Sequence, residues 1–164
     1  QEGRDALAQF HAFAEAAPPP TSVEKKFRFQ LDHDIVTSYL DRLDERAGET
    51  VIIDYKTSSV RDQKDADKDA RESQQLALYA LAYRETIGRL PNRVELHFLT
   101  PGGVVVGRAL KGEKELERVA DRIRTAAGGI RTGLFQATPN PWVCGFCAFR
   151  TICPATAWTG EREG

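Results

Sequence analysis

The stretch VIIDYKTS, residues 51–58, places a carboxylate and an ammonium group at the end of an apolar run. Three aliphatic residues lead up to Asp54, and Lys56 follows two positions later. If the run is a buried strand, these two side chains lie on one face of it, because side chains two apart on a strand point the same way. The pair is therefore either a salt bridge or part of a reaction centre.

A hairpin would place a second aspartate opposite Asp54. Ala47-Gly48 supplies a turn between two apolar segments, and in an antiparallel hairpin centred on this turn Asp41 faces Asp54. Directly opposed side chains have Cβ atoms about 5 Å apart, so the two carboxylates repel each other. A divalent cation between them reverses the repulsion, since hard cations such as Mg²⁺ take carboxylate oxygens. Lys56, one step further along the same face, can then orient a water molecule or stabilise charge on a phosphate.

The alternative is a surface hairpin with scattered charges. We give this interpretation to Asp44 and Glu45, which lie near the turn. Asp41 and Asp54 differ because they flank apolar residues within their strands. A slip of one residue in the register would remove the pairing, so the geometry alone leaves both a metal site and a charged surface open.

Helices and strands alternate along the chain in an order that can position these residues. Hydrophobic periodicity, helix stop signals and the turn sequence TPGG set the expected boundaries. The stretch DQKDADKDARES is too polar for a core and is interpreted as a solvated loop running into a helix. The order indicates an α/β or α+β sandwich. Helices are predicted for residues 1–17, 74–87 and 113–127, and strands for residues 23–31, 35–43, 50–57, 94–99 and 104–109.

The composition fits one domain of ordinary size. At 164 residues the chain can bury a sizeable core. Its 23 basic and 24 acidic residues nearly balance, which neither indicates a polyanionic partner nor excludes a local basic groove. No apolar run approaches the ~20 residues of a membrane helix, and the first residues do not form a signal peptide, so we expect a cytoplasmic protein with no membrane partner. The chain contains no methionine, and we expect it to be a piece of a longer chain.

A further pair of polar side chains follows the lysine strand. In SQQLALYALAYRE, Gln75 and Tyr79 are four residues apart and therefore lie on one helical face. Taken alone, Tyr79 would be a core aromatic and Gln75 a surface residue. His97, in the alternating segment VELHFL, is interpreted as a packed or surface histidine rather than a ligand.

The three cysteines lie close together in PNPWVCGFCAFRTICPA. A C-x-x-C loop lets two thiolates bind one metal ion, and a third cysteine follows after five more residues. Structural zinc and iron–sulfur clusters usually need four ligands, and no histidine has a spacing that recommends it as the fourth. The alternative is three buried thiols without a metal. The cysteines are Cys144, Cys147 and Cys153, and the histidines are His11, His33 and His97.

The segment YLDRLDERAGETVIIDYKTS closely resembles the core of the PD-(D/E)XK nucleases, in particular of their RecB-like branch. The resemblance implies an α/β, restriction-endonuclease-like core, with a central mixed sheet flanked by helices, and a one- or two-metal hydrolysis of DNA. Asp41 matches the first metal-binding aspartate, Asp54 the second, and Lys56 the catalytic lysine. Mg²⁺ or Mn²⁺ is the implied cofactor. Ser38 stands where this branch usually has glycine.

The same branch carries a glutamine and, four residues later, a tyrosine after the lysine strand. The resemblance implies that Gln75 supports the catalytic site and that Tyr79 helps to place the DNA or the lysine strand. We prefer these roles to the interpretation of Tyr79 as a core aromatic and of Gln75 as a surface residue. In this family a histidine or glutamate on an upstream helix completes the metal site. We expect that helix to lie before residue 1.

The cysteine triplet resembles the tail of the iron–sulfur RecB-like nucleases, among them the AddB and AdnB type nuclease domains and the CRISPR adaptation nucleases. There a [4Fe–4S] cluster takes its fourth cysteine from far upstream. The resemblance implies that Cys144, Cys147 and Cys153 bind such a cluster, which is expected to be incomplete here because the chain has no upstream cysteine. The expected division is a nuclease core over residues 1–138 and an irregular, cysteine-rich tail over residues 139–164.

Together these features predict a metal-dependent deoxyribonuclease with exonuclease action. We expect the C-terminal module of a helicase–nuclease in DNA end resection and double-strand-break repair, joined to an upstream helicase domain and working with a partner subunit. Two alternatives stay open: a non-catalytic DNA-binding or scaffold module of the same fold, and a stand-alone CRISPR adaptation nuclease.

Overall fold

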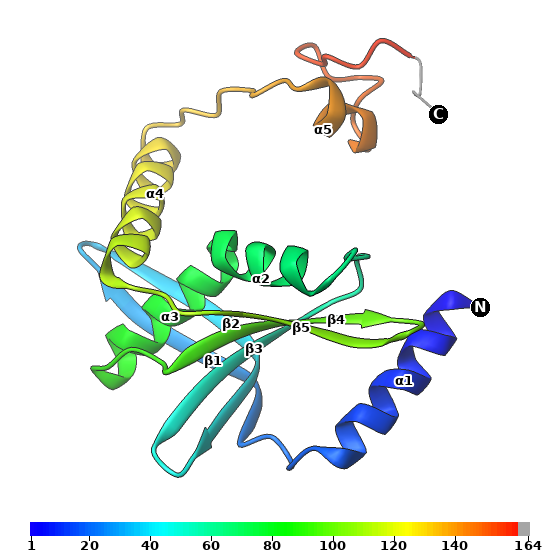
Figure 1. Cartoon of the computed structure of the whole chain (residues 1–164). Coiled ribbons are helices and arrows are strands. Elements are labelled where there is room, and N and C mark those ends of the chain that lie inside the picture. Colours follow the sequence, from blue (N-terminus) through cyan, green and yellow to red (C-terminus); the bar gives the residue numbers. More distant parts are fainter. Residues whose placement is uncertain (161–164) are drawn as a thin grey trace. The chain divides into compact units, whose positions relative to one another are not determined.

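The computed structural model describes residues 1–160 and is built around one mixed β-sheet (Figure 1). Its five strands follow the order β1-β2-β3-β4-β5. All neighbours pair antiparallel except β3 and β4, which are parallel. The predicted α/β class, a central mixed sheet flanked by helices, is confirmed. The strands are β1 (Ser22–Leu31), β2 (Asp34–Arg46), β3 (Glu49–Lys56), β4 (Arg93–Thr100) and β5 (Gly103–Ala109).

Helices cover both faces of the sheet. α1 lies on one face, against β4 and β5, while α2 and α3 lie on the other and form the connection between the parallel strands β3 and β4 (Figure 1). The first turns of α4 add Leu116, Val119 and Ala120 to the core on which α3 packs. The helices are α1 (Glu2–Ala16), α2 (Gln63–Glu72), α3 (Gln74–Ile87), α4 (Glu113–Arg131) and α5 (Pro141–Phe146).

The hairpin of β2 and β3 has the predicted register. Arg46 pairs with Glu49, and the ladder continues to the pair of Arg42 and Ile53. The turn residues Ala47 and Gly48 have φ values of 49° and 83°, the double positive φ of a tight hairpin turn whose twist matches the strands. The register therefore follows from the turn, and it fixes which residues of the two strands face each other.

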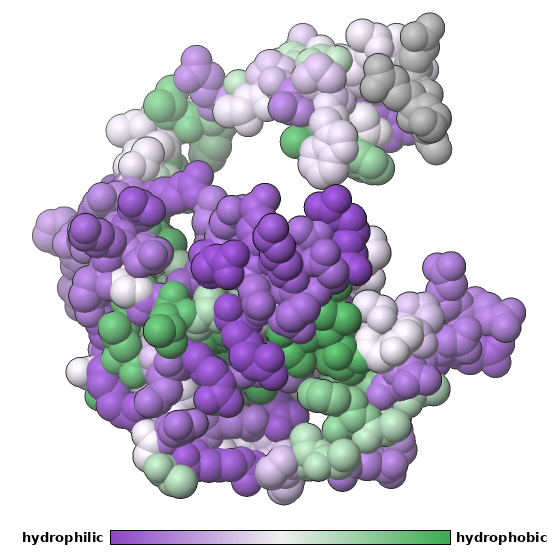
Figure 2. All heavy atoms as spheres, in the orientation of Figure 1, coloured by the Kyte–Doolittle hydropathy of each residue, from purple (hydrophilic) through white to green (hydrophobic). Residues whose placement is uncertain are grey.

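The prediction of a solvated loop over residues 62–73 is wrong for most of its length, because α2 forms there. Asp62 caps the helix by accepting a hydrogen bond from Asp65 N at 2.8 Å. Ala66 and Ala70 are fully buried, whereas hydrophilic side chains cover the outer surface of α2 (Figure 2). A Cβ atom added to Gly107 of β5 would lie 2.1 Å from the carbonyl oxygen of Ala66. Two alanines and one glycine thus let a very polar helix lie directly on the sheet.

α3 begins and ends where the sequence predicts. Ser73 caps it by accepting from Leu76 N at 3.1 Å, and Gly88 ends it in the left-handed conformation with φ of 85°, which glycine adopts without strain. The inward face carries Tyr79 and Tyr83, which are both buried. α3 therefore presents two tyrosine hydroxyls to the strands that hold the candidate site.

The chain divides into two compact units, Gln1–Thr125 and Ala126–Gly164. The described part of the second unit contains the end of α4, the short helix α5 and irregular segments. Several of its large apolar side chains are exposed, among them Trp142 and Phe146, whose rings stack edge to face at 5.4 Å. No helix within residues 1–160 is long and apolar enough to cross a membrane.

Candidate active site

Asp54 is a buried carboxylate near the end of β3. Only 1% of its surface is exposed. Burial is the main reason that the pKa of Asp54 lies above its ordinary value; Lys56 opposes this shift, and the negative charge of Asp41 adds to it. A buried carboxylate in its charged form needs a cationic partner, and Lys56 is such a partner.

Four side chains form a closed ring at this point. Lys56 Nζ lies 2.7 Å from Asp54 Oδ2 as an ion pair and donates to Gln75 Oε1 at 2.7 Å. Gln75 Nε2 donates to the Tyr79 hydroxyl at 2.7 Å, and this hydroxyl donates to Asp54 Oδ1 over a long 3.5 Å. The hydrogen bonds run from Lys56 through Gln75 and Tyr79 to Asp54, and the ion pair of Lys56 with Asp54 closes the ring, so the amide of Gln75 has a defined orientation. The ring ties α3 to the end of β3.

The hydroxyl of Tyr79 stays a donor in this ring. Burial is the main reason that the pKa of Tyr79 lies above its ordinary value, and the negative charges of Asp54 and Asp41 add to the effect. The hydrogen bond from Gln75 lowers the pKa of Tyr79 and so opposes this shift. A protonated tyrosine and a charged lysine therefore both point at the Asp54 carboxylate.

Asp41 lies one step beyond the last pair of the β2–β3 ladder, which is Arg42 with Ile53. Continuing the register places it opposite Asp54, as predicted. Its Oδ2 atom accepts a hydrogen bond from the backbone N–H of Tyr55 at 3.1 Å. The Asp41 carboxylate therefore accepts the hydrogen bond from a backbone N–H of β3 just beyond the point where the two strands stop pairing. This bond holds the carboxylate beside Asp54.

The two aspartates suit a hard divalent cation. Among the described residues, the buried Oδ2 atom of Asp54 has the Lys56 ammonium group as an ion-pair partner at 2.7 Å and accepts no further hydrogen bond. Mg²⁺ is often held by one or two carboxylates, with water and substrate phosphate as its other ligands. Within residues 1–160, no three or more His, Cys, Asp or Glu side chains are grouped to hold a metal ion. Asp41 and Asp54 are thus the described residues that would hold the cation.

An open cleft of about 450 Å³ lies beside Lys56. Lys56 and Gln75 form one part of its wall, and Leu96 of β4 forms another. The side facing α2 carries Asp69 and Glu72. The side chain of Lys56 is 32% exposed, so its ammonium group reaches the cleft while it contacts the buried Asp54.

The face of β3 opposite Asp54 and Lys56 is supported by side chains that the sequence did not single out. Tyr55 lies between Asp54 and Lys56 in the chain, and its ring packs edge to face against Phe10 of α1 at 5.2 Å and His97 at 5.8 Å. The alternation of β3 could have indicated this, because Tyr55 must point away from its two neighbours. α1 therefore covers the face of β3 opposite Asp54 and Lys56.

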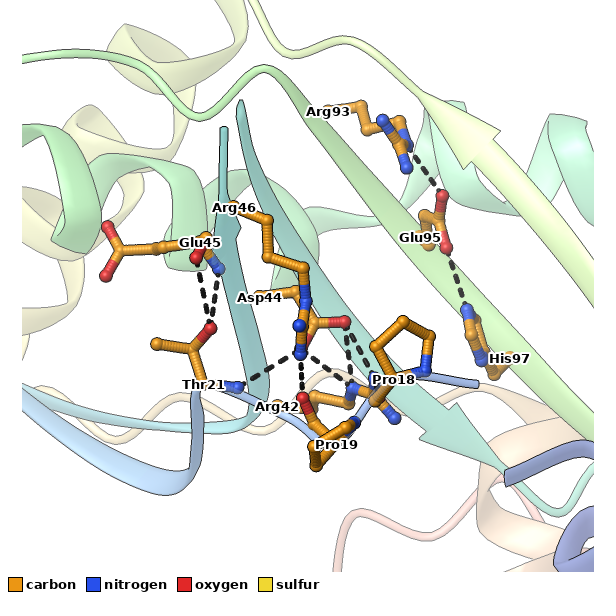
Figure 3. Close-up of polar contacts among 10 residues, drawn as sticks. All are labelled: Pro18, Pro19, Thr21, Arg42, Asp44, Glu45, Arg46, Arg93, Glu95 and His97. Atoms are coloured by element: carbon orange, nitrogen blue, oxygen red, sulfur yellow. Dashed lines mark hydrogen bonds and ion pairs between the residues drawn. The ribbon is translucent and has the colours of Figure 1, made fainter. Parts of the chain in front are cut away.

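A buried charge network runs along β4 on this same face. Figure 3 shows Glu95 between Arg93 and His97, with contacts of 2.8 Å to each. His97 is 4% exposed, as the interpretation of a packed histidine anticipated. Sequence reasoning overlooked Glu95, although its two-residue spacing from both Arg93 and His97 was a usable signal.

The charges near the β2–β3 turn have structural partners. Arg42 donates from Nη2 to Asp44 Oδ2 at 2.8 Å and to the carbonyl of Pro18 at 3.2 Å (Figure 3). Glu45 accepts from the Tyr83 hydroxyl at 2.8 Å. Asp44 and Glu45 were interpreted as scattered surface charges, and the structure instead ties them to neighbouring side chains.

The cysteines lie in the second unit. All three are half-buried and free of disulfides. Cys144 Sγ accepts a hydrogen bond from Ala157 N at 3.5 Å, and this bond is the main reason that the pKa of Cys144 lies below its ordinary value. The predicted clustering of Cys144, Cys147 and Cys153 around one metal is not seen within residues 1–160.

Comparisons with known proteins indicate the family of this chain. A family model described as the PD-(D/E)XK nuclease superfamily matches residues 3–154. The Gene 69 protein of Mycobacterium phage L5 is 25% identical over 144 residues, which cover 85% of this chain and 47% of that protein. The Gene 69 protein of Mycobacterium phage D29 is 26% identical over 140 residues, with 81% and 48% covered. The chain thus spans about half the length of these relatives.

A solved structure, that of SSO0001, resembles the chain in fold. The TM-score is 0.57 at 19% sequence identity, and the match covers 92% of this chain and 68% of the other. At this identity the likeness supports the arrangement of helices and strands only.

Proposed function

The chain belongs to the PD-(D/E)XK nuclease superfamily, and from this premise we propose that it hydrolyses phosphodiester bonds of DNA with Mg²⁺ or Mn²⁺ held by Asp41 and Asp54. The observation that supports this proposal most strongly is the ring that joins Asp54, Lys56, Gln75 and Tyr79. It places a partly exposed ammonium group against a buried carboxylate, with both held by a neighbouring helix.

The side chains have different roles at the scissile phosphate. A divalent cation at the two aspartates supplies Lewis-acid stabilisation of the charge that develops on phosphate. Lys56 donates hydrogen bonds to a phosphate oxygen or to the attacking water, where a positioned cation stabilises the transition state more than the ground state. Gln75 and Tyr79 hold the lysine in place, so its ammonium group needs little reorganisation when the substrate binds.

The proposal is tested by cleavage of labelled DNA in Mn²⁺ by the unchanged chain, Asp54→Asn and Lys56→Ala. We expect each variant to lose at least about a hundred-fold in rate, the usual effect of removing one charge-stabilising group. The control is Asp5→Asn, which removes an exposed carboxylate of α1 and should cleave at the original rate. Circular dichroism must show the same fold in all four proteins. Unimpaired cleavage by folded Asp54→Asn would rule out the proposed centre.

We further propose that this unit works as an exonuclease module within a longer helicase–nuclease that resects DNA ends, with an upstream helicase domain and a partner subunit. The coverage of about half of the matched phage proteins supports a modular arrangement. Comparing linear DNA with covalently closed circles of the same sequence tests the exonuclease step. Cleavage of linear DNA alone supports it, and equal cleavage of circles would indicate an endonuclease, as in a stand-alone nuclease that trims DNA before integration.

A non-catalytic DNA-binding module is a second candidate, and one observation favours it. The described residues contain no group of three potential metal ligands, so the cation would depend on two carboxylates and the substrate. DNA binding without cleavage at any Mn²⁺ concentration would support this candidate over the nuclease.

We also propose that Cys144, Cys147 and Cys153 bind an iron–sulfur cluster together with a ligand from outside this chain. The C-x-x-C spacing supports the proposal, as does the lowered pKa of Cys144, because the thiolate is the form that binds metals. Iron and sulfide analysis on anaerobically purified protein, with and without an upstream extension, tests it. Zinc, or no metal in either form, would contradict it.

A further inference from the structure

The cleft beside Lys56 has walls of three different kinds, and the proposed hydrolysis uses only one of them. Lys56 contributes the ammonium group that contacts a phosphate in the proposed function. Leu96 and Phe98 of β4 form an apolar part of the wall, and both side chains are otherwise buried. Asp69 and Glu72 of α2 form a third part, which we call the acidic wall.

The cleft lies on the same face of the sheet as the candidate site. In the parallel pairing of β3 and β4, Leu96 is the partner of Asp54 and Phe98 is the partner of Lys56. Paired residues of neighbouring strands point to one face. α2 lies on this face as well, over Gly107 of β5, which pairs with Leu96. The apolar part of the cleft and the acidic wall are therefore continuous with the site.

The acidic wall is placed where it does not stabilise the helix that carries it. Asp69 and Glu72 are exposed and three residues apart in the last turn of α2, so their like charges are neighbours. Negative charges are also unfavourable at the end of a helix, where the last carbonyl groups carry partial negative charge. Within residues 1–160, neither carboxylate forms a hydrogen bond or an ion pair, whereas Asp65, one turn earlier, pairs with Arg61.

The order of the three walls matches the order of groups in a nucleotide. With a phosphate at Lys56, the base of the same nucleotide can lie along the apolar part and turn its polar edge to the acidic wall. The cleft volume of about 450 Å³ is within the range of sites for small ligands. Carboxylates repel phosphate groups and only accept hydrogen bonds, so the acidic wall is suited to the N–H groups of a base and not to the DNA backbone.

The bases differ in how many N–H donors they present to such a wall. On its Watson–Crick edge guanine has two adjacent donors, N1–H and the 2-amino group, which match the two oxygens of a carboxylate. Thymine has a single donor between two carbonyl oxygens, and carboxylates repel these oxygens. The Watson–Crick edge is free for recognition only when the base is unpaired. The acidic wall therefore favours guanine in a single strand.

We propose that the cleft binds the base next to the phosphate at Lys56, and that Asp69 and Glu72 select an unpaired guanine by accepting hydrogen bonds from its N1–H and 2-amino groups. This inference rests on the proposed function, because it takes DNA as the ligand and places a phosphate at Lys56. The alternative is that the acidic wall is a solvated helix end that weakens the binding of all DNA equally. The two roles differ in whether the charges set a preference among bases or only the overall affinity.

The test compares three fluorescent oligothymidylates of about ten nucleotides by anisotropy. One has a central deoxyguanosine, one has deoxyinosine, which lacks only the 2-amino group, and one has thymidine throughout. Ca²⁺ replaces Mn²⁺ to supply the two aspartates with a hard cation, and a gel confirms that each oligonucleotide stays intact. We expect the unchanged chain to bind the guanine oligonucleotide at least about 5-fold more tightly than either of the others.

The variants Asp69→Asn and Glu72→Gln and their combination keep the size of the side chains and replace acceptors with amide donors. The double variant should bind all three oligonucleotides at least as tightly as the unchanged chain, because phosphate repulsion is removed. Its preference for guanine should fall to within about two-fold. Asp5→Asn is the matched control, because it removes an exposed carboxylate from α1, on the opposite face of the sheet, and should keep the preference.

The outcomes separate this inference from the proposed function. If the unchanged chain binds the three oligonucleotides equally or not at all, the inference is overturned, whether or not the chain cleaves DNA in Mn²⁺. A guanine preference that survives in the folded double variant also overturns it. If the preference is present and is lost in the double variant, while no DNA is cleaved in Mn²⁺, the base site is supported and the nuclease proposal fails. Thermal unfolding should show variants that are at least as stable as the unchanged chain, because charges unfavourable to α2 are removed.

Discussion

At the scale of single residues, the candidate site depends on how a lysine is held. Lys56 is partly exposed, and such a side chain ordinarily samples many rotamers. Its contacts with Asp54 and Gln75 restrict it, and Tyr79 completes the ring by joining those two partners. Networks of this kind are worth more than isolated pairs, because each member orients the next. We therefore propose that Gln75 and Tyr79 act by positioning Lys56.

Tyr79→Phe tests this positional role. Removing the hydroxyl leaves Gln75 Nε2 and Asp54 Oδ1 without their partner, which should cost about 1–2 kcal/mol of stability. We expect the cleavage rate to fall by roughly ten-fold with little change in KM, because a misplaced lysine acts on the transition state.

Tyr83→Phe is the matched control for that variant. Tyr83 lies one turn further along α3 and bonds to Thr50 and Glu45, outside the ring. It should lose a similar amount of stability and keep its cleavage rate. Equal rate losses in the two variants would mean that the ring has a structural role only.

Glu95 makes the stability of the fold depend on pH. Burial by itself would raise the pKa of Glu95, but hydrogen bonds with His97 and Arg93 outweigh burial and lower the pKa to about 2. Because the folded pKa lies below the ordinary value of 4.5, Glu95 stabilises the fold above that pH, and this stability is lost as the pH falls toward 2. The loss should be on the order of 3 kcal/mol.

Urea unfolding between about pH 7 and pH 3 measures this dependence. The unchanged chain should become steadily less stable over the acid half of the range, and Glu95→Gln should show a flatter profile there. The same slope in both proteins would show that other carboxylates cause the acid sensitivity.

At the scale of elements, the sequence predicts the parts whose signals are local. The Ala47-Gly48 turn and the apolar run before Asp54 are sufficient to place Asp41 opposite it, and Ser73 and Gly88 mark the ends of α3. The helix α2 was missed because its only buried residues are alanines, which add little to a hydrophobic pattern. The bond from Tyr55 N to Asp41 and the packing of Phe10 on Tyr55 join distant segments, and no local pattern reports them.

The contact between α2 and β5 is sensitive to one methyl group. Gly107→Ala would place a Cβ atom 2.1 Å from the Ala66 carbonyl oxygen, and backbone cannot move aside as a flexible side chain can. We expect a loss of at least about 1–3 kcal/mol, the usual cost of overpacking, measured by urea unfolding. Gly128→Ala, where the new Cβ meets nothing within 4 Å, should instead stabilise α4 by up to about 1 kcal/mol. A neutral Gly107→Ala would contradict this close packing.

At the scale of the whole molecule, all five candidate catalytic residues lie within the first compact unit, Gln1–Thr125. Its helix α4 continues to Arg131, and Gly133 follows with a positive φ of 67°. We therefore expect a chain of residues 1–133 to unfold cooperatively and to keep DNA cleavage within a few-fold, as measured by circular dichroism and a nuclease assay. Loss of the fold in this shortened chain would show that the cysteine-containing unit is needed to hold the core together.

The charge of the molecule is nearly balanced overall, with a net charge of −1, but it is unevenly placed around the site. Acidic side chains line the α2 side of the cleft. The effect of the protein on a polyanion at the cleft therefore depends on the local charge distribution rather than on the total charge.

The most direct test of the central claim is a double-mutant cycle on Mn²⁺-dependent DNA cleavage, with Asp41→Asn, Asp54→Asn and the double variant. If the two carboxylates hold one cation, each single variant should lose nearly all of the activity, and the double variant should lose little more, because residues that act as a unit are not additive. Independent, additive losses, or cleavage that survives in either single variant, would contradict a shared metal site at Asp41 and Asp54.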